Sequence, residues 1–297
     1  MVERPAPVLR ALLQGTVDYA GLFPPATLHL HEAATRYHAH RCSRDAWMLA
    51  RFVVPAASLS DLAAERRGLG AADGAWPLSV LVGDDVQADV ARIRAFAEQQ
   101  HHDLHIDAVE FRAGALEIVA ATLDQLPDGI SSYVELPIGD DTRESLAMLK
   151  HAGARAKART GGVTPDAFPS GHALARFIQS CAELGVSFKA TAGLHHPLVG
   201  EYALTYAADS ARARMFGFVN VFAAAALAQG GLRGDALVDV LRDDDPRAFQ
   251  FTEDAMRWRT HEVTAEQIAR ARASLLISFG SCSFDEPVAG LRALELL

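Results

Sequence analysis

Two lysines stand at matching positions in two short apolar segments of the sequence. Lys157 lies in the run Ala-Lys-Ala-Arg-Thr-Gly-Gly at 156–162, and Lys189 lies in Phe-Lys-Ala-Thr-Ala-Gly at 188–193. The lysines are 32 residues apart, and one strand-helix-strand step takes roughly 30 residues. We therefore expect them side by side on adjacent parallel strands.

Two amines held close together in a partly desolvated site favour carbonyl chemistry. Burial and a neighbouring positive charge both lower the pKa of a lysine, and a neutral lysine attacks a carbonyl carbon to form a Schiff base. Three carboxylates interrupt other apolar runs, namely Asp18, Asp107 and Glu135. Each is a candidate to shuttle a proton or to hold a lysine in place. A structural ion-pair network remains the alternative interpretation of these charges.

The elements that must position these residues alternate between strands and helices. Helical spacing of apolar residues is clear at 86–100 and 168–184. Such alternation predicts right-handed crossovers and a parallel sheet, and eight units predict a (β/α)8 TIM barrel. The expected strands lie at 16–22, 47–54, 78–82, 105–111, 131–136, 154–159, 186–191 and 216–221. In such a barrel the side chains that do chemistry come from the C-terminal ends of the strands.

The chain beyond the expected eighth strand has a different pattern. Residues 264–276 form a helix with a capping box, and 278–287 form a compact polar and aromatic segment. This part is too small to build a good core of its own. We therefore predict a barrel at 1–230 and, at 231–297, a helical and irregular C-terminal extension packed on it.

Composition restricts the class of partner and the compartment. The formal net charge is −9 over 297 residues, which argues against nucleic acid and anionic membranes as partners. The most apolar stretch, 215–228, is too short to span a bilayer. The N-terminus lacks the apolar core of a signal peptide, and three sparse cysteines form no disulfide framework. We expect a cytoplasmic protein, and association into a homo-oligomer is left open.

The lysine segments resemble those of class I deoxyribose-phosphate aldolases along nearly the whole barrel. Residues 157–161 are similar to that family's Schiff-base motif Lys-x-x-Thr-Gly, and 188–193 are similar to its second-lysine motif. Asp18, Asp107 and Glu135 have counterparts in the same order. The resemblance implies that Lys157 forms the imine and that Lys189 depresses the pKa of Lys157. It also implies that Asp107, together with Asp18, relays protons through a water.

The sequence departs from that family where the substrate phosphate would bind. Family members hold the phosphate with glycine and serine backbone at the eighth strand, whereas the expected eighth strand here continues as Phe-Val-Asn-Val-Phe at 218–222. Arg159 replaces a small polar residue beside the imine position, and a guanidinium there can clamp a carboxylate. A small aldehyde, ketone or keto acid is therefore the expected substrate.

The remaining candidate residues belong to substrate binding. They are Arg159, Glu135, Thr191, His195, His196 and Asn220. We expect no cofactor and no metal, because the adjacent histidines form no tight ligand motif with His172. The hypothesis is thus an aldolase-type lyase with its imine on Lys157. Two alternatives stay open, a barrel isomerase or metal-assisted hydrolase that uses His195 and His196, and a non-catalytic barrel.

Overall fold

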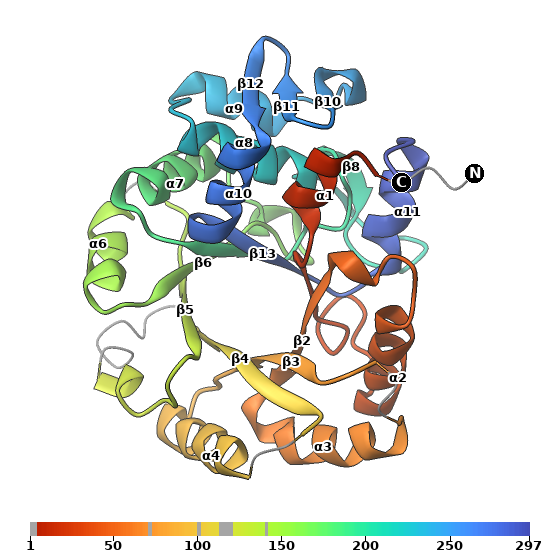
Figure 1. Ribbon diagram of the computed structural model, residues 1–297, viewed down its shortest axis with the longest axis vertical. Helices are drawn as coiled ribbons and strands as arrows, with labels where there is room; N and C mark the ends of the chain where they lie inside the picture. The colour runs from red at the N-terminus through yellow and green to blue at the C-terminus, as the bar shows by residue number, and fades with distance from the viewer. Residues whose placement is uncertain (1–4, 71–72, 100–101, 113–120, 140–141) are drawn as a thin grey trace.

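A closed barrel of eight parallel strands forms the centre of the molecule (Figure 1). The computed structural model describes residues 5–70, 73–99, 102–112, 121–139 and 142–297. Around the barrel the strand order is β1-β13-β7-β6-β5-β4-β3-β2. The barrel strands are β1 (Val17–Tyr19), β2 (Leu49–Pro55), β3 (Trp76–Leu81), β4 (Leu104–Phe111), β5 (Ser131–Leu136), β6 (Arg155–Arg159), β7 (Phe188–Thr191) and β13 (Leu276–Ser281).

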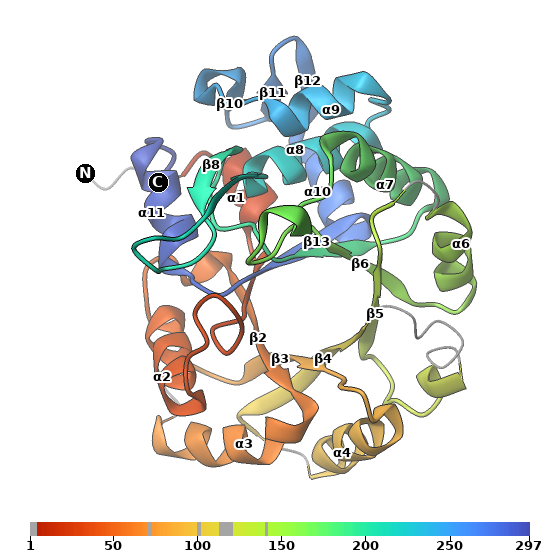
Figure 2. The ribbon, with the colours of Figure 1, turned by 180° about the vertical axis from the view of Figure 1, so that it is seen from behind.

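Helices lie outside the barrel wall and cover it (Figures 1 and 2). In the described part of the chain they are α1 (Pro7–Leu13), α2 (Leu30–Arg41), α3 (Leu59–Gly68), α4 (Val86–Glu98), α6 (Arg143–His151), α7 (Gly171–Leu184), α8 (Phe218–Gln229), α9 (Asp235–Arg242), α10 (Ala265–Ser274) and α11 (Asp285–Ala293). The predicted TIM barrel is thereby confirmed. The helices expected at 86–100 and 168–184 correspond to α4 and α7.

Local signals in the sequence set the ends of these two helices. The Asp85 side chain accepts a hydrogen bond from the Ala88 amide at the start of α4, and Ser170 caps α7 in the same way through Ala173. Gly185 ends α7 with a φ of 64°, a left-handed conformation that glycine adopts without steric cost. Each helix thus places one apolar face against the barrel.

The eighth strand was predicted wrongly. Residues 216–221 do not join the barrel, because most of this segment is the first turn of α8. The run continues into four alanines at 223–226, and alanine is the best helix former. The strand that closes the barrel is β13, which pairs with β7 on one side and β1 on the other. The predicted boundary at 230 therefore does not divide the barrel from an extension, since β13, which lies beyond it, is one of the barrel strands.

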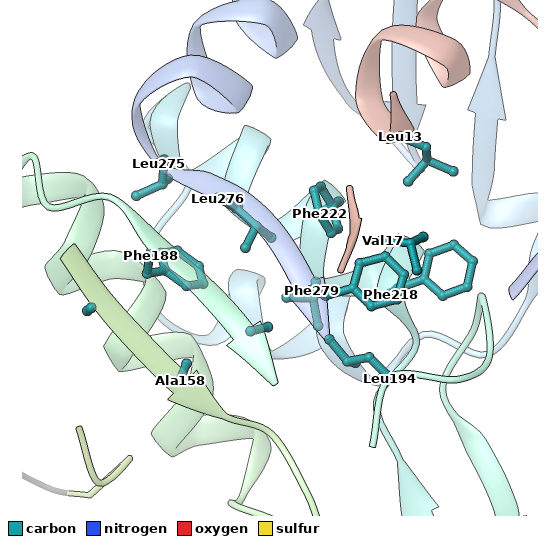
Figure 3. Packing of buried hydrophobic residues seen from close by; sticks show 14 of the residues in the cluster. Leu13, Val17, Ala158, Phe188, Leu194, Phe218, Phe222, Leu275, Leu276 and Phe279 are labelled. Atoms are coloured by element: carbon teal, nitrogen blue, oxygen red, sulfur yellow. The ribbon is translucent and has the colours of Figure 1, made fainter. Parts of the chain in front are cut away.

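Packing on the outer side of β13 shows why α8 is a helix with no polar face. Phe279 of β13 stacks on Phe218 of α8 with ring centroids 5.1 Å apart, and Phe222 meets the same ring edge-on at 5.9 Å (Figure 3). Residues 218–228 of α8 are all buried. A helix that is apolar all round is buried all round, and short apolar runs in such helices look like strands.

Two small antiparallel sheets are added to the barrel. The strands β8 (Gly200–Ala203) and β9 (Arg212–Met215) form a hairpin between β7 and α8. The strands β10 (Phe249–Phe251), β11 (Ala255–Trp258) and β12 (His261–Thr264) form a sheet that lies outside the barrel beside α9 (Figure 1). Within the described ranges, no helix is long and apolar enough to cross a membrane.

Candidate active site

The two lysines lie directly opposite each other on neighbouring strands, as predicted. Lys157 of β6 pairs in register with Lys189 of β7. Both side chains are buried, with exposed fractions of 4% and 1%. The flanking residues are small, since Ala158 pairs with Ala190. Two adjacent strands thus deliver two amines to the barrel interior at one level.

A carboxylate that sequence reasoning missed lies between the two amines. Glu110 accepts from the Lys189 Nζ at 2.6 Å and lies 3.0 Å from the Lys157 Nζ. Ser79 donates a third contact to Glu110 at 2.6 Å. The pKa of Glu110 is lowered, because the two lysines outweigh the opposing effect of burial. The expected repulsion between two amines is therefore replaced by a shared counter-charge.

A β-bulge explains why Glu110 faces inward. The pairing of β3 with β4 shifts between Ile106 and Ala108, so that Asp107 is an extra residue in the ladder. Strict alternation along β4 would put Asp107 and Glu110 on opposite faces. The inserted residue reverses this alternation beyond the bulge. The pattern of the sequence alone gives no sign of the shift.

Lys189 has a second carboxylate beneath it. Its Nζ donates to Asp18 of β1 at 2.5 Å, and Ser278 of β13 donates to the same oxygen at 2.7 Å. Burial opposes the charged form of Lys189, but Asp18 and Glu110 outweigh it, so the pKa of Lys189 is raised. The pKa of Asp18 is lowered for the same reason. Lys189 is thus a fixed cation at neutral pH.

Lys157 has a different second partner. Its Nζ lies 3.0 Å from Glu135 of β5, and Arg159 donates to that carboxylate at 2.9 and 3.3 Å. Burial opposes the charged form of Glu135, yet the pKa of Glu135 is lowered by Lys157 and Arg159. Glu135 therefore holds both Lys157 and Arg159 in place. Its own side chain does not line the cavity above the lysines.

Asp107 does not take the position expected of a proton relay. Its carboxylate contacts the Arg51 Nε at 2.5 Å, and its side chain is 40% exposed. Arg51 also lies 3.4 Å from Asp18. Burial opposes the charge on Arg51, but Asp18 and other anionic neighbours raise its pKa. Glu110, and not Asp107, is the β4 carboxylate that contacts both lysines.

A cavity of about 440 Å³ opens above the lysines at the C-terminal ends of the strands. Glu110, Lys157 and Lys189 line it together with Arg159 and Thr191. The other walls include apolar and polar residues from the first loop, the β8–β9 hairpin and the end of β13: Phe23, Pro24, Pro25, Tyr202, Leu204, Tyr206, Arg212, Met215, Gly280, Cys282 and Glu286. Two of the lining residues are exposed to solvent, since the Arg159 side chain is half-exposed and Tyr206 is exposed, so the cavity is open at this side.

The true eighth strand brings a glycine to this cavity. β13 ends at Gly280 and Ser281, and Gly280 lines the cavity. The run Gly-Ser-Cys-Ser at 280–283 leads into α11. The eighth strand that was expected at 216–221 thus lies some 60 residues later in the sequence, and it contains two serines and a glycine. The polar composition of residues 278–287 is visible in the sequence, but the prediction places this segment in the C-terminal extension.

Of the other predicted binding residues, the histidines reach the cavity and Asn220 does not. His195 and His196 both line the cavity wall. Asn220 is fully buried in α8, where its side chain accepts from the Val199 amide and donates to the carbonyls of Val240 and Asp243. Asn220 therefore ties α8 to its neighbours, and the predicted substrate contact is wrong.

In the ranges that the structure covers, no group of three or more histidine, cysteine or acidic side chains is arranged to hold a metal ion. His172 lies exposed at the start of α7 and does not line the cavity. Comparison with known proteins adds no assignment, since no protein-family model and no curated protein matches the chain.

Proposed function

We propose that this protein is an aldolase-type lyase that forms a Schiff base between Lys157 and a small carbonyl substrate. The observation that carries the proposal is the placement of the Lys157 amine. It lies at the floor of an accessible cavity, between two carboxylates, and opposite a second buried lysine. This position at the C-terminal face of the barrel is where such folds hold their chemistry.

The surroundings of Lys157 provide a route for its proton. The amine must lose a proton before it attacks, and Glu110 and Glu135 each lie 3.0 Å from its Nζ. The nitrogen then adds to the carbonyl carbon, and the carbonyl oxygen leaves as water after taking up protons. A carboxylate within hydrogen-bond reach serves as base in the first step and as acid in the second.

Lys189 is suited to a supporting role. It is bound to Asp18 and Glu110 and its pKa is raised, so its amine is protonated and is not a nucleophile at neutral pH. Its charge keeps Glu110 ionised beside Lys157. Lys189 therefore acts on the Lys157 site through their shared partner Glu110.

The cavity favours a carbonyl compound with a short apolar or anionic substituent. Phe23, Leu204 and Met215 supply apolar wall, and the guanidinium groups of Arg159 and Arg212 supply positive charge. Aldehydes, ketones and keto acids of a few carbon atoms fit this composition. The three cysteines are unpaired, which suits a reducing, cytoplasmic setting.

The proposal is tested by borohydride trapping. The protein is incubated with acetaldehyde, acetone, dihydroxyacetone or pyruvate, reduced, and mapped by mass spectrometry. We expect a reduced adduct on Lys157 that is absent from Lys157→Ala, with loss of lyase turnover on the order of 10³-fold or more, as for other covalent nucleophiles.

The surface lysine Lys150 provides the matched control, since Lys150→Ala removes an amine on α6. Adduct on Lys157 should be unchanged in that variant. A folded wild-type protein that gives no adduct with any of the four compounds would end the proposal. That result would favour the alternative in which the ion pairs of both lysines serve a non-catalytic barrel.

A further inference from the structure

A buried histidine with one unoccupied ring nitrogen lines the same cavity as Lys157. His195 follows β7 and is 9% exposed. Its Nδ1 lies 2.8 Å from the Glu286 Oε2 and 3.4 Å from the Ser281 Oγ. The Nε2 atom has no hydrogen-bond partner among the residues that the structure describes. One ring nitrogen is thus anchored, and the other is left for a molecule in the cavity.

The anchor comes from two elements in the C-terminal part of the chain. Glu286 belongs to α11, and Ser281 ends β13. The Cys282 Sγ lies 4.0 Å from the same Nδ1, and the Tyr206 hydroxyl lies 3.5 Å from that sulfur. A carboxylate on Nδ1 fixes the ring and stabilises its protonated form.

The neighbouring histidine shows what the anchor does. His196 stacks on Tyr202 at 3.5 Å, and burial together with the charge of His195 lowers its pKa to about 4. Burial also opposes the charge on His195, but contacts with Cys282 and Glu286 raise its pKa to about 9. Two adjacent rings in one wall are therefore a neutral imidazole and an imidazolium.

We propose that His195 is a second catalytic residue, which protonates the oxygen of an acceptor aldehyde when the Lys157 enamine attacks that aldehyde. The inference rests on the proposed function and adds an acid for the second carbonyl partner. Glu286 is its positioning residue. The substrate class is narrowed to an aldehyde acceptor, or, in the reverse direction, a β-hydroxy carbonyl compound.

The step balances without any further reactant. The enamine carbon forms a bond to the aldehyde carbon, and the C=O π electrons move to oxygen, which takes the proton from the His195 Nε2. The Lys157 nitrogen becomes an iminium, and water releases it. In cleavage the neutral His195 takes the hydroxyl proton, the C–C bond breaks, and its electron pair forms the enamine.

At saturating substrate, turnover in the two directions should depend on pH with opposite sign. Condensation needs the imidazolium and should fall as pH rises through about 9, whereas cleavage needs the neutral ring and should rise toward that pH. The ionisable groups that face the ring are Glu286, Cys282, His196 and, through Cys282, Tyr206. Glu286→Gln removes the carboxylate and should move both limbs to lower pH.

The experiment separates the two carbonyl partners. Enamine formation is followed by deuterium exchange into acetone in D₂O and by borohydride trapping on Lys157, and condensation is followed with glycolaldehyde as acceptor. In His195→Gln we expect exchange and trapping within a few-fold of wild type and condensation lowered about 10²–10⁴-fold. His172→Gln, the same substitution at an exposed site on α7, should change neither.

Three outcomes overturn the inference. If His195→Gln condenses the two carbonyl compounds at the wild-type rate and with the wild-type pH dependence, His195 is not the acid. A parallel loss of trapping and condensation in that variant shows a structural role. Absence of a Lys157 adduct in the wild type removes the proposed function, and the inference falls with it. A ¹H NMR titration of His195 that moves down in Glu286→Gln supports the positioning role without any substrate.

Discussion

Buried ion clusters lie at both ends of the barrel, and the one at the carboxyl ends of the strands lines a cavity. At the amino end of β3, Arg66 and Asp73 pair at 2.9 Å with both side chains fully buried. Asp73 also accepts from the Trp76 Nε1 at 2.6 Å, and the Arg66 guanidinium lies over that ring at 4.6 Å. At the other end, the lysine cluster lines a cavity of about 440 Å³.

The difference is between an ion cluster packed inside the protein and one that lines the candidate active site. Neither Arg66 nor Asp73 lines the cavity above the lysines, and both are tied to the packing around Trp76. In the lysine cluster, four cationic side chains meet four carboxylates, and the set is Arg51, Lys157, Arg159, Lys189, Asp18, Asp107, Glu110 and Glu135. Asp18, Glu110 and Glu135 each have two cationic partners, so removal of one cation leaves each of them another, whereas Asp107 pairs with Arg51 alone among the described residues.

The largest expected effect on stability distinguishes the two lysines. Lys189→Met removes the shortest cationic contact of both Asp18 and Glu110, which keep Arg51 at 3.4 Å and Lys157 at 3.0 Å respectively. Because both carboxylates are buried, we expect about 3 kcal/mol of destabilisation in urea unfolding. In Lys157→Met, Glu110 keeps Lys189 and Glu135 keeps Arg159, and we expect no more than about 1–2 kcal/mol. Equal losses in the two variants would show that the shared partners do not protect the cluster.

A smaller effect is expected at the amino end. Asp73→Asn removes the carboxylate that faces Arg66, while Asp103 at 3.9 Å remains the nearest alternative. We expect a loss of about 2–3 kcal/mol, with unchanged Lys157 trapping per folded molecule. A lower trapping yield at full folding would break the proposed separation of the two ends.

The smallest effect is the acid dependence of the cavity cluster. The folded-state pKa values of Asp18, Glu110 and Glu135 are lowered, so their stabilising effect is complete above the ordinary carboxyl pKa near 4.5 and is lost as pH falls. Glu110→Gln should reduce the slope of unfolding free energy against pH below that value by about 1.4 kcal/mol per pH unit. An unchanged slope in urea unfolding between pH 4 and 2.5 would contradict this assignment.

The sequence predicted the barrel and the lysine pair because these depend on short-range patterns. Alternation of strands and helices and the 32-residue spacing of Lys157 and Lys189 follow from one strand-helix-strand step. The prediction of the eighth strand was wrong for a physical reason. An all-apolar helix start at Phe218 resembles a buried strand, whereas the true strand at 276–281 carries serines and a glycine.

The inner partners of the lysines depend on features that no local pattern contains. The bulge at Asp107 turns Glu110 inward, and the contact between His195 and Glu286 joins residues 91 positions apart. Asn220 was misplaced together with its helix. Thr191 and Arg159 were found because each follows a lysine on the same strand face.

Closure of the barrel by β13 has a consequence for biosynthesis. Asp18 and Ser278, which share a hydrogen bond beneath Lys189, are 260 residues apart. While the chain is being translated, the edges of β1 and β7 that β13 later covers have no partner, and unpaired strand edges promote aggregation. A nascent chain that stops before 276 therefore holds both lysines but lacks a closed ring around them, and Asp18 gains its hydrogen bond from Ser278 only after β13 has been synthesised.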